Sequence, residues 1–290
     1  YQTILGEKGG VEILLMVIKR HDHDQNVLKN AFRALSNVLL NNKENKKIAC
    51  TIEFIETLSV LMLRFTDDLV LQTHGCIIYG LLADNWYYTE DLIKVMPVVL
   101  GAMKLHLSKA SLQQGGCMLL YYVYGHILEK NKTIKPKEST ANVQTSTLHD
   151  PKTALPRKVV SVDAAVSQKA VFQILTLMDY HRKDPRLVEW ASRAISIVAG
   201  ENIDARKKFT EMNGTAIIIM TMSLFPMNEN IQQCACYALS RVVSHHPFNR
   251  AVSMIVPLDL FAKHTNRHLR STEIKATGWN PSHTCCYEKL

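Results

Sequence analysis

Several long polar side chains in this sequence are of types that recognise other molecules, and some lie four residues apart. Arginine offers forked donors that match carboxylate and phosphate groups, and tyrosine offers a rigid contact surface. Residues four apart share one face of a helix. The residues that we expect to contact a partner are Arg33, Asn37, Tyr122, Arg193, Tyr237 and Arg241. This chemistry suits a protein or peptide partner that is acidic or phosphorylated.

The sequence contains no motif of a known catalytic or cofactor site. It has no glycine-rich phosphate loop, no nucleophile elbow and no HExxH zinc motif. Close helix packing accounts for Gly75, Gly115 and Gly116 without phosphate binding. We therefore expect a protein that is not an enzyme, with no catalytic residues and no cofactor.

Histidines and cysteines near the end of the sequence could bind zinc by residue type. His264 and His268 lie four apart, and His283, Cys285 and Cys286 follow. Their spacing matches no zinc-finger pattern, so we expect no metal site. The 7 cysteines of the chain show no disulfide framework in their spacing. This favours a reducing compartment, cytoplasmic or nuclear.

The candidate contact residues lie in a block that recurs five times. The block is an aliphatic residue, three variable positions, a small residue and then an apolar stripe with helical spacing. It starts at Val27, Leu71, Leu112, Leu187 and Ile231, with spacings of 44, 41, 75 and 44 residues. Such a period is typical of repeat proteins, in which each unit stacks on its neighbours to bury a shared core.

Residues that hold the same position in all five blocks form a column, and these columns indicate how the helix packs. The fifth position is always small, and its residues are Ala31, Gly75, Gly116, Ala191 and Ala235. Aliphatic residues hold the first and twelfth positions, which gives one buried helix face. A small side chain lets a neighbouring helix approach closely, so we expect Gly75 and Gly116 to face a neighbouring long helix.

The contact candidates occupy positions seven and eleven of the block. The other residues in these two columns are Ile77, Leu81, Met118 and Ile197. Upstream of the block, residues 7–15 and 211–218 each carry a turn glycine before an apolar helix, and residues 201–209 add a short helix. Glycine after a short helix fits the left-handed cap position. The predicted unit is a short helix, a glycine turn, a medium helix and a long helix.

The segment ALSNV at 34–38, followed by NKENKK, resembles an armadillo repeat, as does ENIDARKKFTEMNGTAIIIM running into IQQCACYALSRVV. The resemblance covers most of residues 4–262. It implies an all-α, right-handed superhelical solenoid of three-helix repeats, whose long helices line a concave groove that grips an extended partner. HEAT-like repeats, with two helices at a similar period, are the alternative fold.

Readers of nuclear localisation signals of the importin-alpha type carry tryptophan and asparagine in the two groove columns. Here the seventh column has no tryptophan, and only Asn37 matches in the eleventh. The resemblance to armadillo repeats therefore does not extend to a nuclear transport adaptor, which we disfavour.

The net charge of +8 is concentrated in two segments. Residues 130–158 carry +5 and residues 263–290 carry +3, so the repeats themselves are neutral. A nucleic-acid-binding solenoid would carry basic charge along its repeats, so we expect no nucleic-acid partner. The longest apolar run, from Thr215 to Phe225, is about half of what a membrane span needs.

The pattern divides the chain into four parts. Residues 1–129 and 159–270 hold the armadillo-like repeats, residues 130–158 form a disordered basic insertion rich in Ser, Thr and Lys, and residues 271–290 form a polar tail. The insertion has no aromatic residue and few aliphatic ones, so it cannot bury enough surface to order itself. The first unit lacks its expected beginning, so we expect a piece of a longer chain.

These observations favour a protein-interaction scaffold that binds an extended or helical segment in its groove. The alternative is an armadillo-type regulatory domain that controls a kinase or a small GTPase through its edge. We expect a cytoplasmic protein, with a nuclear location as the second choice.

Overall fold

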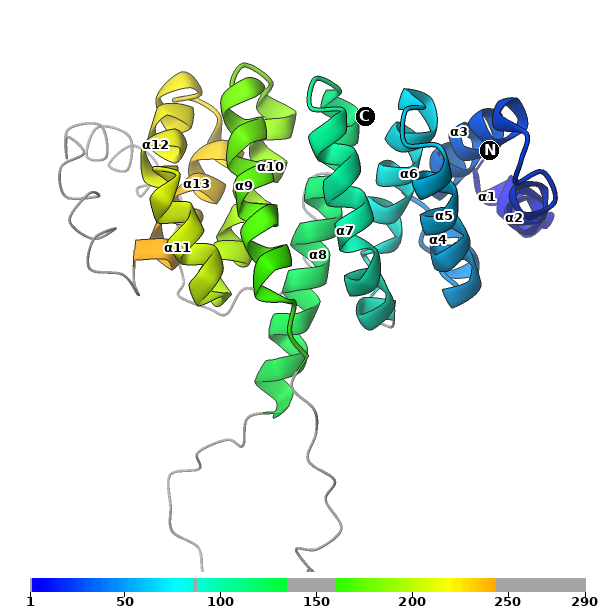
Figure 1. The fold of residues 1–290 in the computed structure, drawn as a ribbon, viewed down its shortest axis with the longest axis horizontal. Helices are drawn as coiled ribbons and strands as arrows, with labels where there is room; N and C mark the ends of the chain where they lie inside the picture. The colour runs from blue at the N-terminus through cyan, green and yellow to red at the C-terminus, as the bar shows by residue number, and fades with distance from the viewer. Residues whose placement is uncertain (1, 86–87, 135–159, 244–290) are drawn as a thin grey trace, which may run out of the picture.

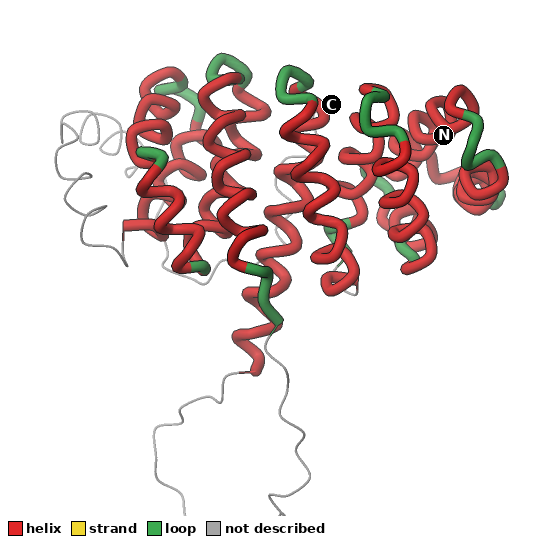
Figure 2. The backbone as a smooth tube through the Cα atoms, viewed as in Figure 1, coloured by secondary structure: helices red, strands yellow, loops and turns green. Residues whose placement is uncertain are grey.

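The computed structural model describes residues 2–85, 88–134 and 160–243 of the chain (Figure 1). Every regular element in these residues is a helix, as Figure 2 shows. The helices are α1 (Gln2–Glu7), α2 (Gly10–Arg20), α3 (Gln25–Leu39), α4 (Lys43–Ala49), α5 (Ile52–Arg64), α6 (Leu69–Leu82), α7 (Thr89–Leu105), α8 (Ala110–Ile134), α9 (Ala164–Tyr180), α10 (Pro185–Glu201), α11 (Ile203–Glu211), α12 (Gly214–Leu224) and α13 (Glu229–Val243). The predicted all-α solenoid is confirmed.

The helices form five units that stack side by side. The recurring blocks form the long helices α3, α6, α8, α10 and α13, and each of these packs against the next. The medium helices α2, α5, α7, α9 and α12 form a second layer, which lies in front of the long helices in Figure 1. Buried apolar side chains between the two layers join into one core that runs from Val11 to Val242.

Among the described residues, only the first, second and fifth units have the predicted three helices. Their short helices are α1, α4 and α11. The third and fourth units consist of α7 with α8 and α9 with α10, which is the two-helix form expected of the HEAT-like alternative. In these two units the medium helix has 17 residues, against 11 to 13 in the others. In the third and fourth units, the longer medium helix therefore covers the part of the core that the short helix covers in the other units.

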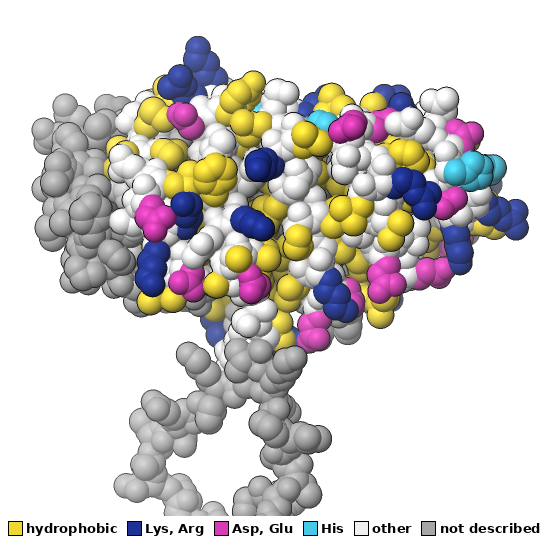
Figure 3. Space-filling model, in the orientation of Figure 1, with side chains coloured by type: hydrophobic (Ala, Val, Ile, Leu, Met, Phe, Trp, Pro, Cys, Tyr) yellow, Lys and Arg dark blue, Asp and Glu magenta, His cyan; other side chains and the backbone are white. Residues whose placement is uncertain are grey.

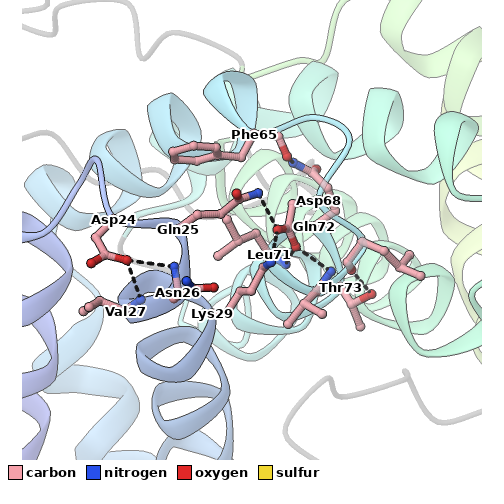
Figure 4. A network of polar contacts seen from close by, with 12 residues as sticks. Asp24, Gln25, Asn26, Val27, Lys29, Phe65, Asp68, Leu71, Gln72 and Thr73 are labelled. Atoms are coloured by element: carbon pink, nitrogen blue, oxygen red, sulfur yellow. Dashed lines mark hydrogen bonds and ion pairs between the residues drawn. The ribbon is translucent and has the colours of Figure 1, made fainter.

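Four of the five long helices begin with the same kind of side-chain cap. Asp24 and Asp68 accept hydrogen bonds at 2.9 to 3.1 Å from the backbone N–H groups two and three residues ahead (Figure 4). Asp184 caps α10 in the same way, and Asn228 caps α13. These caps satisfy N–H groups that have no partner inside the helix. The residue at the equivalent position before α8 is Lys109.

A glutamine that is buried in the second and third units and partly buried in the fifth ties the long helix to the medium helix. Gln72, Gln113 and Gln232 hold the second position of the block, and each Nε2 donates to two backbone carbonyls at the end of the medium helix, at 2.7 to 3.1 Å. Carbonyls at a helix end lack a partner within the helix, so the side-chain amide satisfies them. The first and fourth units have Leu28 and Val188 at this position, which are fully buried instead.

Gly75 and Gly116 face medium helices, so our expectation that they face a long helix was wrong. A Cβ added at Gly75 would lie 2.6 Å from Met62 Sδ of α5, and one at Gly116 would lie 2.3 Å from Met103 Sδ of α7. Both contacts are made within the unit. A small residue predicts a close neighbour, but its position along one helix does not say which of the adjacent helices approaches it.

Two long helices approach each other closely at Gly80 of α6 and Gly115 of α8. A Cβ added at Gly80 would lie 2.6 Å from the carbonyl oxygen of Gly115. One added at Gly115 would lie 2.6 Å from the backbone of Cys76. These are backbone atoms, which cannot move aside as a methionine side chain can, so only glycine fits at this crossing.

The helix before the expected insertion is longer than the sequence pattern indicated. α8 continues to Ile134, so the first five residues of the segment 130–158 are helical. Lys130 Nζ lies 2.7 Å from Glu90 Oε1, and the Asn131 amide exchanges two hydrogen bonds with the backbone of Val160, at 2.8 and 3.2 Å. Residues 135–159 and 244–290 lie outside the described residues, so the limits of the insertion and of the tail stay predictions.

Alanine in place of Gly115 and of Gly101 is expected to change stability in opposite directions. Gly115→Ala places a methyl group against the backbone of α6 and should lower the free energy of unfolding by about 1–3 kcal/mol. Gly101 is exposed on α7, where an added Cβ meets no atom within 4 Å, so Gly101→Ala should raise it by up to about 1 kcal/mol. Urea unfolding followed by circular dichroism measures both. Equal stability of the two variants would contradict the close helix contact.

Replacing residues 136–158 with a short glycine-serine linker should leave the midpoint of thermal unfolding nearly unchanged. Asn131 and Val160 already hold the two ends together, and loop length adds only about 0.6 kcal/mol per doubling. Differential scanning calorimetry tests this. A matched Asn131→Ala variant should be less stable than the linker variant, because it removes both hydrogen bonds. A large loss of stability in the linker variant would mean that the segment packs on the repeats.

Candidate functional site: the face of the long helices

The six candidate contact residues all lie on long helices, and the structure leaves all six at least partly accessible. Arg33 and Asn37 on α3 are exposed. Tyr122 on α8, Arg193 on α10, and Tyr237 and Arg241 on α13 are partly buried. We call this accessible side of the long-helix layer the groove face. Of the other residues in the two columns, Ile77 is partly buried, whereas Leu81, Met118 and Ile197 are buried in the stack.

An aromatic cluster forms where α8 meets α10. The ring centroids of Tyr121 and Tyr122 lie 5.2 Å apart, and both lie close to Trp190 of α10, at 6.0 and 6.2 Å. Tyr122 also stacks on His126, one turn further along α8, at 6.3 Å. These edge-on and tilted arrangements are the favourable geometries for aromatic pairs. We call Tyr121, Tyr122 and Trp190 the aromatic cluster.

Arg193 extends this cluster along α10. Its guanidinium carbon lies 5.4 Å from the centroid of the Trp190 ring, and its Nη2 lies 2.7 Å from Glu189 Oε1. Burial acts to lower the pKa of Arg193, but the neighbouring Cys234 and Glu189 outweigh it and raise the pKa. Arg193 is therefore charged, and one acid already compensates part of that charge.

Side chains of α13 reach the same cluster from the next unit. Burial raises the pKa of Tyr121 to about 12, and Arg193 opposes that shift while Cys234 and Tyr237 of α13 add to it. Arg241 lies over the Tyr237 ring, with its guanidinium carbon 5.9 Å from the ring centroid. Four of the six candidate residues, on α8, α10 and α13, thus form one continuous group.

Gly200 makes room for Arg241. A Cβ at Gly200, near the end of α10, would lie 2.8 Å from the Arg241 Nε atom. Partial burial lowers the pKa of Arg241, because it disfavours the charged form. Arg241 is therefore packed against the neighbouring helix as well as against Tyr237, which holds its charged end at a defined place on the groove face.

Arg33 and Asn37 do not join this group, because α6 lies between α3 and α8 in the stack. Next to them, His74 of α6 forms a hydrogen bond with α3: its Nδ1 lies 2.9 Å from Ser36 Oγ. The groove face therefore has a polar part over α3 and α6, and an aromatic and cationic part over α8, α10 and α13.

Three residues beside the candidate contacts were not predicted from the sequence: Trp190, Tyr121 and His74. Trp190 and His74 hold the fourth position of the block, one helical turn before the seventh, and Tyr121 holds the tenth. Residues three or four apart share a helix face, so extending the column of Arg33 and Arg193 back by one turn would have found two of them.

No protein-family model matches the sequence, and no curated protein matches it. Two solved structures resemble the fold. One is an engineered protein, with 16% sequence identity and a TM-score of 0.56 over 84% of this chain and 83% of its own. The other is a designed armadillo repeat protein in complex with the peptide (KR)4, with 16% identity and a TM-score of 0.51 over 83% of this chain and 85% of its own. The chain has an armadillo-like repeat fold.

Two absences among the described residues bear on the class of site. None of their helices combines the length and the apolar character that crossing a membrane requires. No group of three or more His, Cys, Asp or Glu side chains in this part of the chain is placed to hold a metal ion. The histidines and cysteines from His264 onward lie outside the described residues.

Proposed function

We propose that this protein is an interaction scaffold whose groove face binds an extended or helical segment of a partner protein. The observation that carries the proposal is the convergence of Tyr122, Trp190 and Arg193 with Tyr237 from three consecutive long helices. Tryptophan, tyrosine and arginine are the residues that contribute most of the binding energy in protein interfaces. Their partial burial holds the side chains in place before binding, which lowers the entropy lost on association.

The charge of the groove face favours an acidic or phosphorylated partner segment. Arg33, Arg193 and Arg241 all lie on it, and Glu189 is the acid that pairs with one of them. The designed armadillo repeat protein that resembles this fold was solved with a peptide of alternating lysine and arginine. The arginines of the present chain would repel such a peptide, so we infer the opposite preference.

Two further functions fit less well. A nuclear transport adaptor of the importin-alpha type would carry tryptophan in the seventh column, and this chain has its groove tryptophan, Trp190, one turn earlier. Nucleic acid would need basic charge along the repeats, which are neutral in sum.

The buried, unpaired thiols of Cys50, Cys76 and Cys117 support a reducing location, which we propose to be cytoplasmic or nuclear.

Two charge-neutralising changes on α10 should shift partner affinity in opposite directions. The partner is first captured from a cell lysate and identified by mass spectrometry, and its dissociation constant is then measured by calorimetry. Arg193→Gln should weaken binding about tenfold, because it removes a charge-assisted contact. Glu189→Gln should strengthen binding, because it frees the Arg193 guanidinium from its acid.

The matched control is Lys104→Gln, on the exposed face of α7, which should bind as the wild type does. Trp190→Ala should weaken binding at least tenfold, as expected of a central aromatic contact. If Arg193→Gln and Trp190→Ala bind like the wild type, the partner does not use the groove face.

A second candidate is a regulatory domain that controls a kinase or a small GTPase through one edge of the solenoid. Three adjacent medium helices, α7, α9 and α12, each end in a large exposed apolar residue: Leu105 is 57% exposed, Tyr180 59% and Leu224 44%. The first two units end their medium helices with Arg20 and Arg64 instead. Figure 3 shows hydrophobic side chains interspersed with charged ones across the outer face.

The edge candidate makes a different prediction for the captured partner. The double variant Leu105→Ser and Tyr180→Ser should lose most of the binding, because it removes the exposed apolar area of two neighbouring units. Arg241→Gln should then have no effect. The reverse pattern, with loss only in the groove variant, would reject the edge. Exposed substitutions of this kind cost little stability, so circular dichroism should show an unchanged fold.

A further inference from the structure

The two ends of the stack each carry one half of the contact that joins neighbouring units inside it. The first unit, α1 to α3, and the fifth unit, α11 to α13, lie at opposite ends of the stack in Figure 1. In every unit the block starts seven residues after the last residue of the medium helix, as Val27 does after Arg20, so equivalent residues can be compared directly. Three columns contact the preceding unit inside the stack, and the first unit exposes its residue in each of them.

The first column is the fourth position of the block, which meets the tenth position of the preceding unit. These two positions are in contact at three successive unit boundaries. The pairs are Ser36 with His74, Gly80 with Gly115, and Tyr121 with Trp190. In the first unit the fourth position is Asn30, and in the fifth unit the tenth position is Ser240. Both of these residues are exposed.

Ser240 is oriented in the same way as Ser36. The Ser36 hydroxyl donates to the backbone carbonyl three residues earlier, at 2.9 Å, and its oxygen lies 2.9 Å from His74 Nδ1. The Ser240 hydroxyl also donates to the carbonyl three residues earlier, at 2.8 Å, so its oxygen can accept a hydrogen bond from a neighbouring unit. The side-chain amide of Asn30 is a donor of the kind that this oxygen requires.

The second column is the residue that directly follows each medium helix. His106 and His181 hold it in the third and fourth units, and each Nε2 lies 2.7 to 2.8 Å from a backbone carbonyl oxygen in the turn of the preceding unit. That carbonyl belongs to the second residue after the medium helix, and its equivalent in the fifth unit is the carbonyl of Pro226. In the first unit the column holds His21, which is exposed.

The third column lies seven residues before the end of each medium helix. In the fourth unit it holds Gln173, which is buried and donates from Nε2 to the Met103 carbonyl of the preceding unit at 3.0 Å. The residues of this column in the second, third and fifth units are partly buried: Thr57, Val98 and Ile217. In the first unit it holds Ile13, which is 53% exposed. An apolar side chain is thus accessible at a place that the preceding unit covers elsewhere.

We propose that the fifth unit of one copy of this chain stacks against the first unit of a second copy, head to tail. His21 of one copy would donate to the Pro226 carbonyl of the other, and the Asn30 amide would donate to Ser240 Oγ. The same contact would cover Ile13. A second copy fits because both halves of the contact belong to this chain, and the contact continues the interface that already joins its units.

This inference goes beyond the proposed groove function, because it concerns the ends of the stack. A head-to-tail contact uses two different surfaces, so it forms open chains of copies unless the rotation between copies closes a ring. The groove face of one copy would then continue into that of the next.

Sedimentation velocity over a rising protein concentration tests the proposal, and the mean mass should rise above that of one chain. Ile13→Arg places an unpaired charge in the contact on the first unit, and Ser240→Arg does so on the fifth, so each variant alone should stay monomeric. A mixture of the two should form dimers and nothing larger. The reason is that one variant supplies an intact fifth unit and the other supplies an intact first unit.

The matched control is Leu63→Arg, at a residue of α5 that is 60% exposed inside the stack, and it should associate as the wild type does. Exposed substitutions cost little stability, so circular dichroism should show an unchanged fold. If Ile13→Arg fails to fold, His21→Ala replaces it and should weaken association about fivefold, by removing one hydrogen bond. His21→Gln keeps an N–H donor and should restore most of the association.

Three results would overturn the proposal: a wild type that stays monomeric at every concentration, an end variant that associates like the wild type, or a mixture of the two end variants without dimers. The first result is also the one expected if a different segment occupies either end. Trp190→Ala should assemble as the wild type does, because the contact does not involve the aromatic cluster. Failure of the groove proposal therefore leaves the head-to-tail contact standing, and the reverse also holds.

Discussion

The backbone contact between α6 and α8 at Gly80 and Gly115 is the constraint on which the rest of the structure depends. At this crossing a single added carbon would lie 2.6 Å from the opposite backbone. The spacing of the long helices fixes which side chains meet across a unit boundary. Positions ten and eleven of one unit lie beside position four of the next, so Ser36 and His74 come within hydrogen-bond reach and Tyr122 meets Trp190. The groove face is thus a consequence of close helix packing.

That packing distributes the chemistry of the groove face unevenly. Over α3 and α6 lie Arg33 and His74, and over α10 and α13 lie Arg193 and Arg241. Between them, Ile77, Leu81 and Met118 are apolar and mostly buried. A partner segment would therefore meet positive charge at two places, separated by an apolar stretch with the Tyr122 ring at its far side. Charged groups at a fixed separation select a partner by the positions of its charges along the segment as well as by the sign of those charges.

The solenoid tolerates variation in its units because each unit contacts only its neighbours. Among the described residues, the third and fourth units have two helices where the others have three, yet the core passes through them without a break. Asn131 in the last turns of α8 and Val160 before α9 form two hydrogen bonds, close to the two ends of the long connection between these helices. A connection anchored at its base can change in length or sequence without disturbing the stack, and this makes it a place where a repeat protein can acquire new segments.

The sequence by itself determined the repeat, the all-helical fold and the small residues at the fifth positions of the long helices. Each of these follows from periodicity along one helix, which is a local property. Only the tertiary structure decided that Gly75 faces Met62 of a medium helix and that Glu189 pairs with Arg193. It also decided that Leu81 and Ile197 are buried, although they hold the same position of the block as Asn37, Tyr122 and Arg241. It also placed Trp190 between Tyr122 and Arg193. These contacts depend on the relative position of neighbouring helices, and the spacing of residues within one helix does not specify that position.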